Sequence, residues 1–128
     1  MAARLLIDTD VLIDYLRGRA EAVTYLEGLT VALSVSAVTV AELYAGVREG
    51  AERVTLEQFL AAFEVIPVEE SIAVVGGLYR RDFGKSHSTG LADALIAATA
   101  ESIQGTLVTL NVKHFPMLSN VHVPYQKP

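Results

Sequence analysis

"RLLIDTDVLID", residues 4–14, places a short apolar segment directly before two carboxylates, Asp8 and Asp10. A short apolar run that ends at polar residues is typical of a buried β-strand. The residues that follow carry apolar side chains at helical spacing, which favours a helix over 11–18. A strand that passes at once into a helix places Asp8 at the carboxyl end of the strand.

The alternation of strand-like and helix-like segments continues to the end of the chain. Apolar segments typical of strands occupy 4–8, 31–36, 63–68, 105–110 and 120–124, and apolar side chains at three-four spacing favour helices over 38–50, 51–63, 71–83 and 91–103. Such alternation indicates parallel strands joined by right-handed crossovers, with helices on both faces. We predict a three-layer α/β fold with a central, mainly parallel sheet of four to five strands, formed as one domain over 1–128.

Composition limits the function classes. The chain is 52% hydrophobic and 20% charged and has no cysteine, so we expect a compact globular domain without disulfides, zinc–thiolate sites or thiol chemistry. Its opening residues do not resemble a leader peptide, and no apolar run approaches the ~18 residues of a membrane span. We therefore expect a cytoplasmic protein with no membrane partner. The net charge of −5 argues against nucleic-acid binding by bulk attraction, but not against a nuclease whose acids hold a metal.

Four polar side chains are expected at one edge of the sheet. In open α/β sheets, ligands bind outside the carboxyl ends of the strands. Asp8 follows the first predicted strand, and Asn111 follows the strand over 105–110. Glu42 and Asp93 lie early in helices that should begin near the same edge. The topology therefore predicts that these four oxygen-bearing side chains converge.

Each helical acid also has a purely structural explanation. Asp10 or Thr9 would serve as the N-cap of the helix over 11–18. Glu42 follows Thr39 by three positions, which is the spacing of a capping box. Asp93 would be a first-turn acid that the helix dipole favours. These alternatives stay open on the sequence alone.

Asp8 is harder to explain in structural terms. A carboxylate at the end of a buried strand is costly unless something neutralises it. Two carboxylates about 5 Å apart repel by about 3 kcal/mol at an effective dielectric near 20, so a cluster of acids needs a positive partner. Mg²⁺ or Mn²⁺ suits an all-oxygen site of this kind, and such an ion can activate water for attack on a phosphodiester.

Four motifs give the chain a family resemblance. "LLIDTDVLIDYL", "SAVTVAELYAGV", "LADALIAATA" and "LVTLNVKHF" occur in this order over essentially the whole chain. Together they resemble a PIN-domain protein, specifically the VapC toxins of bacterial VapBC toxin–antitoxin modules. The resemblance implies a PIN-like fold and a Mg²⁺- or Mn²⁺-dependent endoribonuclease that cuts structured RNA, either tRNA or rRNA. It also implies a homodimer and neutralisation by a cognate VapB-type antitoxin.

The resemblance assigns roles to the acids. Asp8, Glu42 and Asp93 match the three most regular acidic positions of the family. They are expected to be both the catalytic residues and the metal ligands, with Asp8 and Asp93 binding most directly and Glu42 completing the shell or orienting the attacking water. Replacing any of them by its amide is expected to remove metal binding and to leave the fold intact.

Polar residues around the acids are expected to hold ligands and waters. Thr109 and Asn111 match the polar pair of the last motif, and Thr9 lies within the first. Family members commonly carry a fourth acid at the position of Asn111 or of His114, where this chain has an amide and an imidazole. A second metal is therefore an open question, and His114 is expected to be a surface histidine in a loop.

A local basic segment is the candidate RNA contact. "YRRDFGKSHSTG", residues 79–90, places Arg80, Arg81, Lys85 and His87 just before the helix that carries Asp93. Such cations can hold phosphates without reading sequence. The alternative is a solvated helix end whose cations favour the helix dipole.

Two other functions compete. "DTDV", residues 8–11, also resembles the nucleophile loop of a haloacid-dehalogenase-like phosphatase, in which Asp8 would attack phosphorus and Asp10 would act as acid and base. Such enzymes need a further acidic motif downstream to hold Mg²⁺, but no Asp or Glu follows Thr109 in this sequence. The second alternative is a catalytically degenerate protein that only binds its antitoxin.

Overall fold

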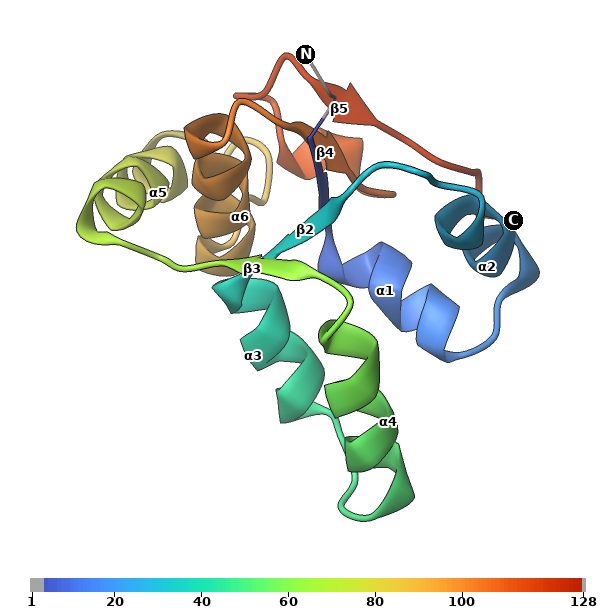
Figure 1. The fold of residues 1–128 in the computed structure, drawn as a ribbon. Helices are drawn as coiled ribbons and strands as arrows, with labels where there is room; N and C mark the ends of the chain where they lie inside the picture. The colour runs from blue at the N-terminus through green and yellow to red at the C-terminus, as the bar shows by residue number, and fades with distance from the viewer. Residues whose placement is uncertain (1–3, 128) are drawn as a thin grey trace.

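The computed structural model describes residues 4–127, which form a parallel β-sheet flanked by six α-helices (Figure 1). In chain order the elements are β1 (Leu5–Ile7), α1 (Thr9–Leu16), α2 (Ala20–Glu27), β2 (Leu33–Ser36), α3 (Ala37–Ala45), α4 (Ala51–Leu60), β3 (Glu64–Ile66), α5 (Glu70–Phe83), α6 (Leu91–Ser102), β4 (Thr106–Val108), the 3₁₀ helix η1 (Val112–His114) and β5 (Val121–His122). None of the helices within 4–127 is long and apolar enough to cross a membrane.

The sheet has the strand order β3-β2-β1-β4-β5, and every neighbouring pair is parallel. β1 lies at the centre, with Leu6 opposite Ser34 of β2 on one side and opposite Leu107 of β4 on the other. All five predicted strands are present, so the predicted sheet is confirmed. Because the strands are parallel, their carboxyl ends meet at a single edge.

Two apolar cores lie on opposite faces of the sheet. Successive residues of a strand point to opposite faces, and in β1 both Leu6 and Ile7 are fully buried. Ile7 packs with apolar residues of α1, α2, α3 and α4, while Leu6 packs with α6, β4 and Phe115. Figure 1 shows α5 and α6 on one side of the sheet and α1 and α2 on the other. The predicted three-layer architecture is therefore confirmed.

Local features differ from the sequence prediction. The first helix, predicted over 11–18, spans Thr9–Leu16 because Asp8 caps it. The helix α2 was not predicted, because it buries only Ala22 and Leu26, a single i,i+4 pair that gives little periodic signal. The helix predicted over 38–50 begins one residue earlier and ends at Ala45. Gly50, with φ +98°, adopts the left-handed conformation that glycine tolerates, and it separates α3 from α4.

The buried acid Asp14 in α1 binds residues 125–127. Asp14 is only 5% exposed, and Tyr125 donates a 2.8 Å hydrogen bond to its Oδ2. Its carboxylate also lies 3.2 Å from Lys127 Nζ and 3.8 Å from Arg19 Nε. Burial raises the pKa of Tyr125, and the hydrogen bond to Asp14 raises it further. Residues 125–127 are therefore held against the first helix.

The helices α5 and α6 approach each other most closely at Gly76. A Cβ atom built at Gly76 would lie 2.6 Å from Leu95 Cδ2 and 3.2 Å from Leu95 Cα, whereas one at Gly77 would meet nothing within 4 Å. The absence of a side chain at Gly76 thus permits the packing of α6 against α5. Gly77 has no such role.

We expect Gly76→Ala to lower the free energy of unfolding by about 1–3 kcal/mol, because the added methyl forces Leu95 away from its packed position. The matched control, Gly77→Ala, should raise it by up to about 1 kcal/mol through helix propensity alone. Urea denaturation followed by circular dichroism measures both variants. If both variants were more stable than the wild type, α6 would have shifted to accept the methyl group added at Gly76.

Candidate active site

Asp8 joins the end of β1 to the start of α1. It is the N-cap of α1, so neither Asp10 nor Thr9 has the capping role considered from sequence. Its Oδ1 accepts a 2.8 Å hydrogen bond from the Thr9 backbone N–H, and its Oδ2 accepts one of 2.8 Å from the Thr109 hydroxyl. Asp8 is 5% exposed. Burial raises its pKa to about 7, and the negative charges of Asp10 and Asp93 contribute to this rise.

Asp10 points across to the segment that follows β4. Its Oδ2 accepts hydrogen bonds of 3.0 Å from both the Leu110 backbone N–H and Asn111 Nδ2, and it lies 3.4 Å from Thr109 Oγ1. Burial raises the pKa of Asp10 as well. Sequence reasoning left this residue out of the site, because only the adjacency of β1 and β4 places it beside residues 109–111.

Glu42 is tied to the first motif rather than to the start of its own helix. Ser36 is the N-cap of α3 and accepts a 3.0 Å bond from the Val38 N–H, so the capping-box alternative for Glu42 is wrong. Glu42 lies in the second turn of α3, where its Oε1 accepts a 2.6 Å hydrogen bond from Thr9 Oγ1. Thr9 Oγ1 also lies 3.1 Å from Thr39 Oγ1. Thr9 thus connects Glu42 to the residue next to Asp8.

Asp93 is the third residue of α6 and is partly buried. Its Oδ2 accepts a 3.4 Å hydrogen bond from the Gly90 backbone N–H. Because Gly90 has no side chain, only this half of a capping box exists, which agrees with the expected first-turn position. The charge of Asp93 also contributes to the raised pKa of Asp8, so the two acids share one electrostatic environment.

His114 fastens η1 to the loop before α6. Its Nδ1 lies 3.2 Å from the carbonyl oxygen of His87 and 3.0 Å from that of Ser88. A nitrogen that faces two carbonyl oxygens must carry a proton. In addition, Thr89 donates a 2.8 Å hydrogen bond to the His114 carbonyl oxygen. His114 is therefore a half-buried structural contact of η1 rather than a free loop side chain.

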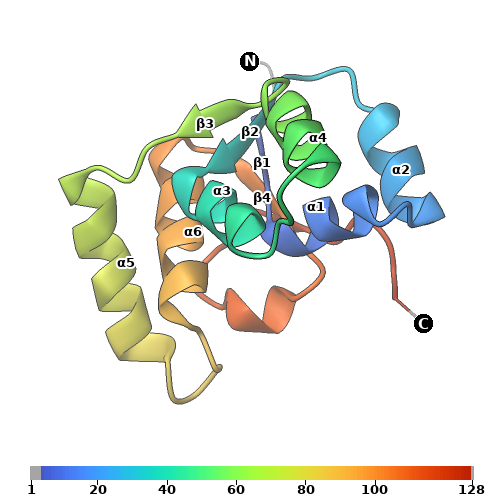
Figure 2. The same cartoon turned by 90° about the horizontal axis from the view of Figure 1, so that it is seen from below.

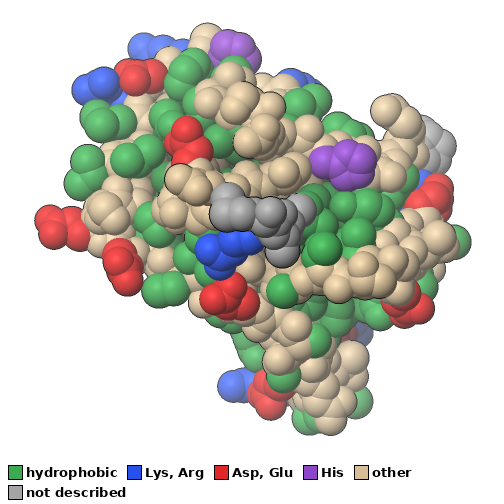
Figure 3. All heavy atoms as spheres, turned by 45° about the horizontal axis from the view of Figure 1, so that its top comes forward, with side chains coloured by type: hydrophobic (Ala, Val, Ile, Leu, Met, Phe, Trp, Pro, Cys, Tyr) green, Lys and Arg blue, Asp and Glu red, His purple; other side chains and the backbone are tan. Residues whose placement is uncertain are grey.

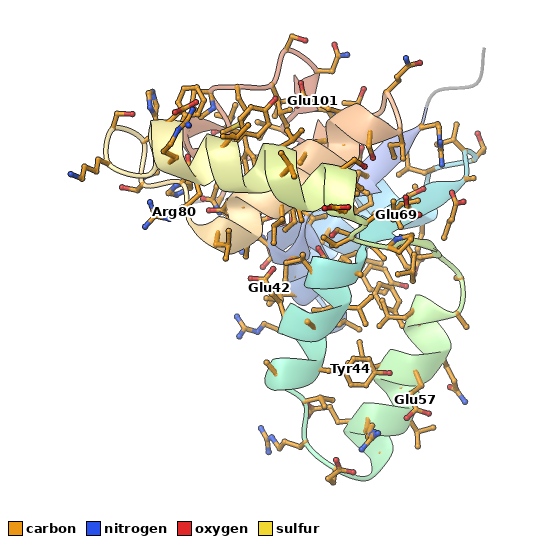
Figure 4. All side chains as sticks on the ribbon, turned by 90° about the vertical axis from the view of Figure 1, so that its left-hand side faces the viewer. Glu42, Tyr44, Glu57, Glu69, Arg80 and Glu101 are labelled. Carbon is orange, nitrogen blue, oxygen red and sulfur yellow. The ribbon has the colours of Figure 1, made fainter. Side chains whose placement is uncertain are left out.

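The four predicted RNA contacts are exposed at the end of α5 and in the loop after it. Arg81 pairs with Asp82, with 2.8 Å between Nε and Oδ1, which offsets part of the local positive charge. Figure 4 shows Arg80 on the same side of the molecule as Glu42. In Figure 3, the Lys and Arg side chains form small separate groups on the visible face, rather than a continuous basic surface. Their role in RNA binding stays a prediction.

The predicted site residues lie around the carboxyl ends of the strands. The first turn of α1, the start of α6 and η1 surround this edge (Figure 2). Here Thr109, which is fully buried, bonds Asp8, and the exposed Asn111 bonds Asp10. The acids do not form a complete metal site on their own. Within residues 4–127, no three His, Asp or Glu side chains converge in a way that could hold a metal ion.

The donor set nevertheless fits a hard divalent cation. All the candidate ligands carry oxygen donors, and no Lys or Arg of residues 4–127 forms an ion pair with the buried Asp8. A carboxylate whose pKa is raised in this way gains from a cation beside it. Mg²⁺ is commonly bound through one or two carboxylates and keeps several of its waters. Asp8 and Asp93 would suffice as protein ligands for such an ion.

A groove opens beside this edge, between α1, α3 and α4. Its volume is about 440 Å³, and Glu42 lies in its wall. Apolar side chains alternate there with charged ones, among them Leu16, Leu43, Leu56, Arg17 and Arg48. The groove therefore offers apolar contact and charges of both signs next to a candidate catalytic acid.

Comparisons with known proteins agree with this architecture. Residues 5–116 match the family model of the PIN domain. Ribonuclease VapC10 of Mycobacterium tuberculosis is 42% identical over 127 residues, which cover 97% of this chain and 95% of that protein. Ribonuclease VapC19 of the same species is 41% identical over 125 residues, covering 94% and 98% of the two chains. A toxin–antitoxin complex from Klebsiella pneumoniae contains a chain with a TM-score of 0.83 and 30% identity, covering 98% of this chain and all of that one.

Proposed function

Because the chain belongs to the PIN-domain family, and within it to the VapC ribonucleases, we propose that it is the ribonuclease toxin of a VapBC-type module, acting in the cytoplasm. The observation that carries the proposal is the buried Asp8 carboxylate at the carboxyl end of β1, whose pKa is raised to about 7 beside Asp10 and Asp93. Such a carboxylate is suited to binding a divalent cation.

In phosphodiester hydrolysis, the residues of this chain would bind the metal, orient the attacking water and hold the metal ligands in place. Asp8 and Asp93 would hold Mg²⁺ or Mn²⁺, which when bound supplies an activated water and stabilises charge on the phosphate. Glu42, held by the Thr9 hydroxyl, would orient the attacking water. Thr109 donates a 2.8 Å hydrogen bond to Asp8 Oδ2, and this keeps that carboxylate oxygen in a constant position.

We propose structured RNA, either tRNA or rRNA, as the substrate. Arg80, Arg81, Lys85 and His87 would contact its phosphates, and the position of Arg80 on the same side as Glu42 supports this (Figure 4). Phosphate contacts of this kind position a substrate without reading its sequence. The choice of RNA would then depend on its shape.

We propose a VapB-type antitoxin and a second copy of this chain as protein partners. The groove between α1, α3 and α4 suits an antitoxin segment with apolar side chains and a cation that reaches Glu42. For the homodimer, α5 carries three exposed apolar side chains, Val74, Val75 and Leu78, which are 55%, 37% and 42% exposed. Exposed apolar groups on one helix are typical of a protein interface.

The phosphatase alternative finds no support at Asp10. The acid–base residue of that mechanism must be free to exchange a proton with the substrate. The Oδ2 of Asp10 is instead engaged by Leu110 and Asn111, and its Oδ1 accepts a 2.8 Å bond from the Val11 N–H. The other alternative is a catalytically degenerate protein that only binds its antitoxin. A measurement of RNA cleavage distinguishes it from the ribonuclease.

We expect the purified, antitoxin-free protein to cut a pool of total tRNA and rRNA into discrete fragments in Mg²⁺ or Mn²⁺, and not in EDTA. Asp93→Asn should lose the fragments because it removes one ligand charge while keeping the side-chain shape. Glu57→Gln, on the exposed surface of α4, serves as the matched control and should cut like the wild type. A folded wild type that cuts nothing in any metal would favour the binding-only alternative.

A further inference from the structure

Asp10 makes more hydrogen bonds than an ordinary first-turn acid of a helix. Its two carboxylate oxygens accept from Val11, Leu110 and Asn111, and one of them lies near the Thr109 hydroxyl. Two of these contacts, to Leu110 and Asn111, cross from α1 to the segment after β4, about a hundred residues further along the chain. The mechanism proposed above uses none of them.

The hydrogen bonds of Asp10 determine how the Asn111 amide is oriented. An ionised carboxylate can only accept hydrogen bonds, and the same oxygen already accepts from the Leu110 N–H. Asn111 must therefore turn its NH₂ group toward Asp10, as the 3.0 Å contact from Nδ2 records. The other end of a planar amide then points away from Asp10. Asn111 is exposed, and no donor among residues 4–127 reaches its Oδ1.

The backbone of Asn111 is fixed as well. Its N–H donates a 3.1 Å hydrogen bond to Thr109 Oγ1, and the Thr109 hydroxyl donates in turn to Asp8 Oδ2 at 2.8 Å. Both ends of Asn111 are thus connected to the first motif, its side chain to Asp10 and its backbone to Asp8 through Thr109. The amide oxygen is left as an exposed acceptor whose direction is fixed by these two contacts.

We propose that Asp10 is a positioning residue, which holds Asn111 so that its amide oxygen, and not its NH₂ group, faces the water and RNA hydroxyl groups at the site. This inference rests on the proposed ribonuclease function. Asp10 does not touch the reacting atoms itself, and it acts through Asn111. An alanine at position 10 would remove the oxygen that accepts from both Leu110 and Asn111, so the Asn111 amide would be free to turn and present its NH₂ group to the site.

A double-mutant cycle in RNA cleavage tests this inference. Asp10→Ala and Asn111→Ala should each lower kcat by about 10–100-fold, the usual loss when a residue that orients a site is removed, with little change in KM. In the Asn111→Ala background, Asp10→Ala should cause no further loss, because the amide that Asp10 orients is gone. Equal losses in both backgrounds would mean that Asp10 acts on the fold alone and would overturn the inference.

The conservative variant Asp10→Asn adds a comparison. Its carbonyl oxygen can take the place of Oδ2 and accept from both Leu110 and Asn111. Its kcat should therefore lie much closer to that of the wild type than the kcat of Asp10→Ala does. An Asp10→Asn variant as impaired as Asp10→Ala counts against the inference.

A second readout does not depend on cleavage. The side-chain NH₂ signals of Asn111 in a ¹⁵N spectrum, identified by their loss in Asn111→Ala, should shift in Asp10→Ala and stay unchanged in Glu57→Gln. A wild type that cuts no RNA would refute the proposed function, while these signals would still report the orientation of Asn111. Unshifted signals in Asp10→Ala would overturn the positioning role whatever the activity.

Discussion

Replacing Asp8 with asparagine is expected to abolish RNA cleavage and, at pH 8 without metal, to make the protein more stable. The loss of activity should be on the order of a thousandfold, because metal-assisted charge stabilisation contributes several kcal/mol to such reactions. Asparagine caps a helix about as well as aspartate, so α1 should persist. Its amide can also keep a contact with the Thr109 hydroxyl, which is free to rotate.

The stability gain follows from the pKa of Asp8. Its folded-state pKa of about 7 lies above the ordinary value of 3.8, because burial and the neighbouring carboxylates disfavour its charge. Between these two values the folded protein binds the proton more tightly than the unfolded chain. The contribution of Asp8 to the stability of the wild type is therefore fully present below about pH 4 and is lost as the pH rises through 7. The loss amounts to at most about 4 kcal/mol for a shift of this size.

Thermal denaturation at pH 5 and pH 8, with and without Mg²⁺, measures both consequences. The Asp8→Asn variant should lose much less stability than the wild type between these pH values. Mg²⁺ should stabilise only the wild type, since a ligand stabilises the form that binds it. Glu57→Gln is again the matched control and should follow the wild type in every condition. A variant less stable than the wild type at pH 8 would mean that α1 requires the charged cap.

Asp14→Ala is expected to lower the free energy of unfolding by about 2–3 kcal/mol, because it removes a charge-assisted hydrogen bond and leaves its partners unpaired. Asp14 is 5% exposed and bonds Tyr125 at 2.8 Å, while Arg19 and Lys127 complete the cluster. The Arg19 and Lys127 side chains are 27% and 48% exposed, so the loss should stay below that of a fully buried ion pair. Glu57→Ala, at an exposed ion pair, should change the stability by less than about 1 kcal/mol.

Urea denaturation followed by circular dichroism gives these free energies directly. Combining Asp14→Ala with Tyr125→Phe isolates the pair, since the two losses should be strongly non-additive if the hydroxyl serves only Asp14. Additive losses would show that Tyr125 holds the end of the chain by its ring alone. Faster digestion of the C-terminal residues by carboxypeptidase in Asp14→Ala would locate the released segment.

Local sequence patterns were enough to predict the layers of this fold. Short apolar runs and three-four spacing record which side of each segment is buried, and they predicted all five strands and the helices that cover them. The motifs around Asp8, Glu42 and Asp93 also identified the family, which the comparisons confirm. The exception is α2, where a single buried i,i+4 pair is too short a pattern to detect.

Which polar groups meet became clear only from the packing of the elements. Asp10 reaches Asn111, Thr9 reaches Glu42, and Asp14 reaches Tyr125 across separations of 101, 33 and 111 residues. None of these pairs leaves a periodic pattern, because a hydrogen bond depends on which strands and helices lie side by side. The adjacency of β1 and β4 therefore made Asp10 a bridge to the last motif and Asp8 a buried carboxylate with a raised pKa.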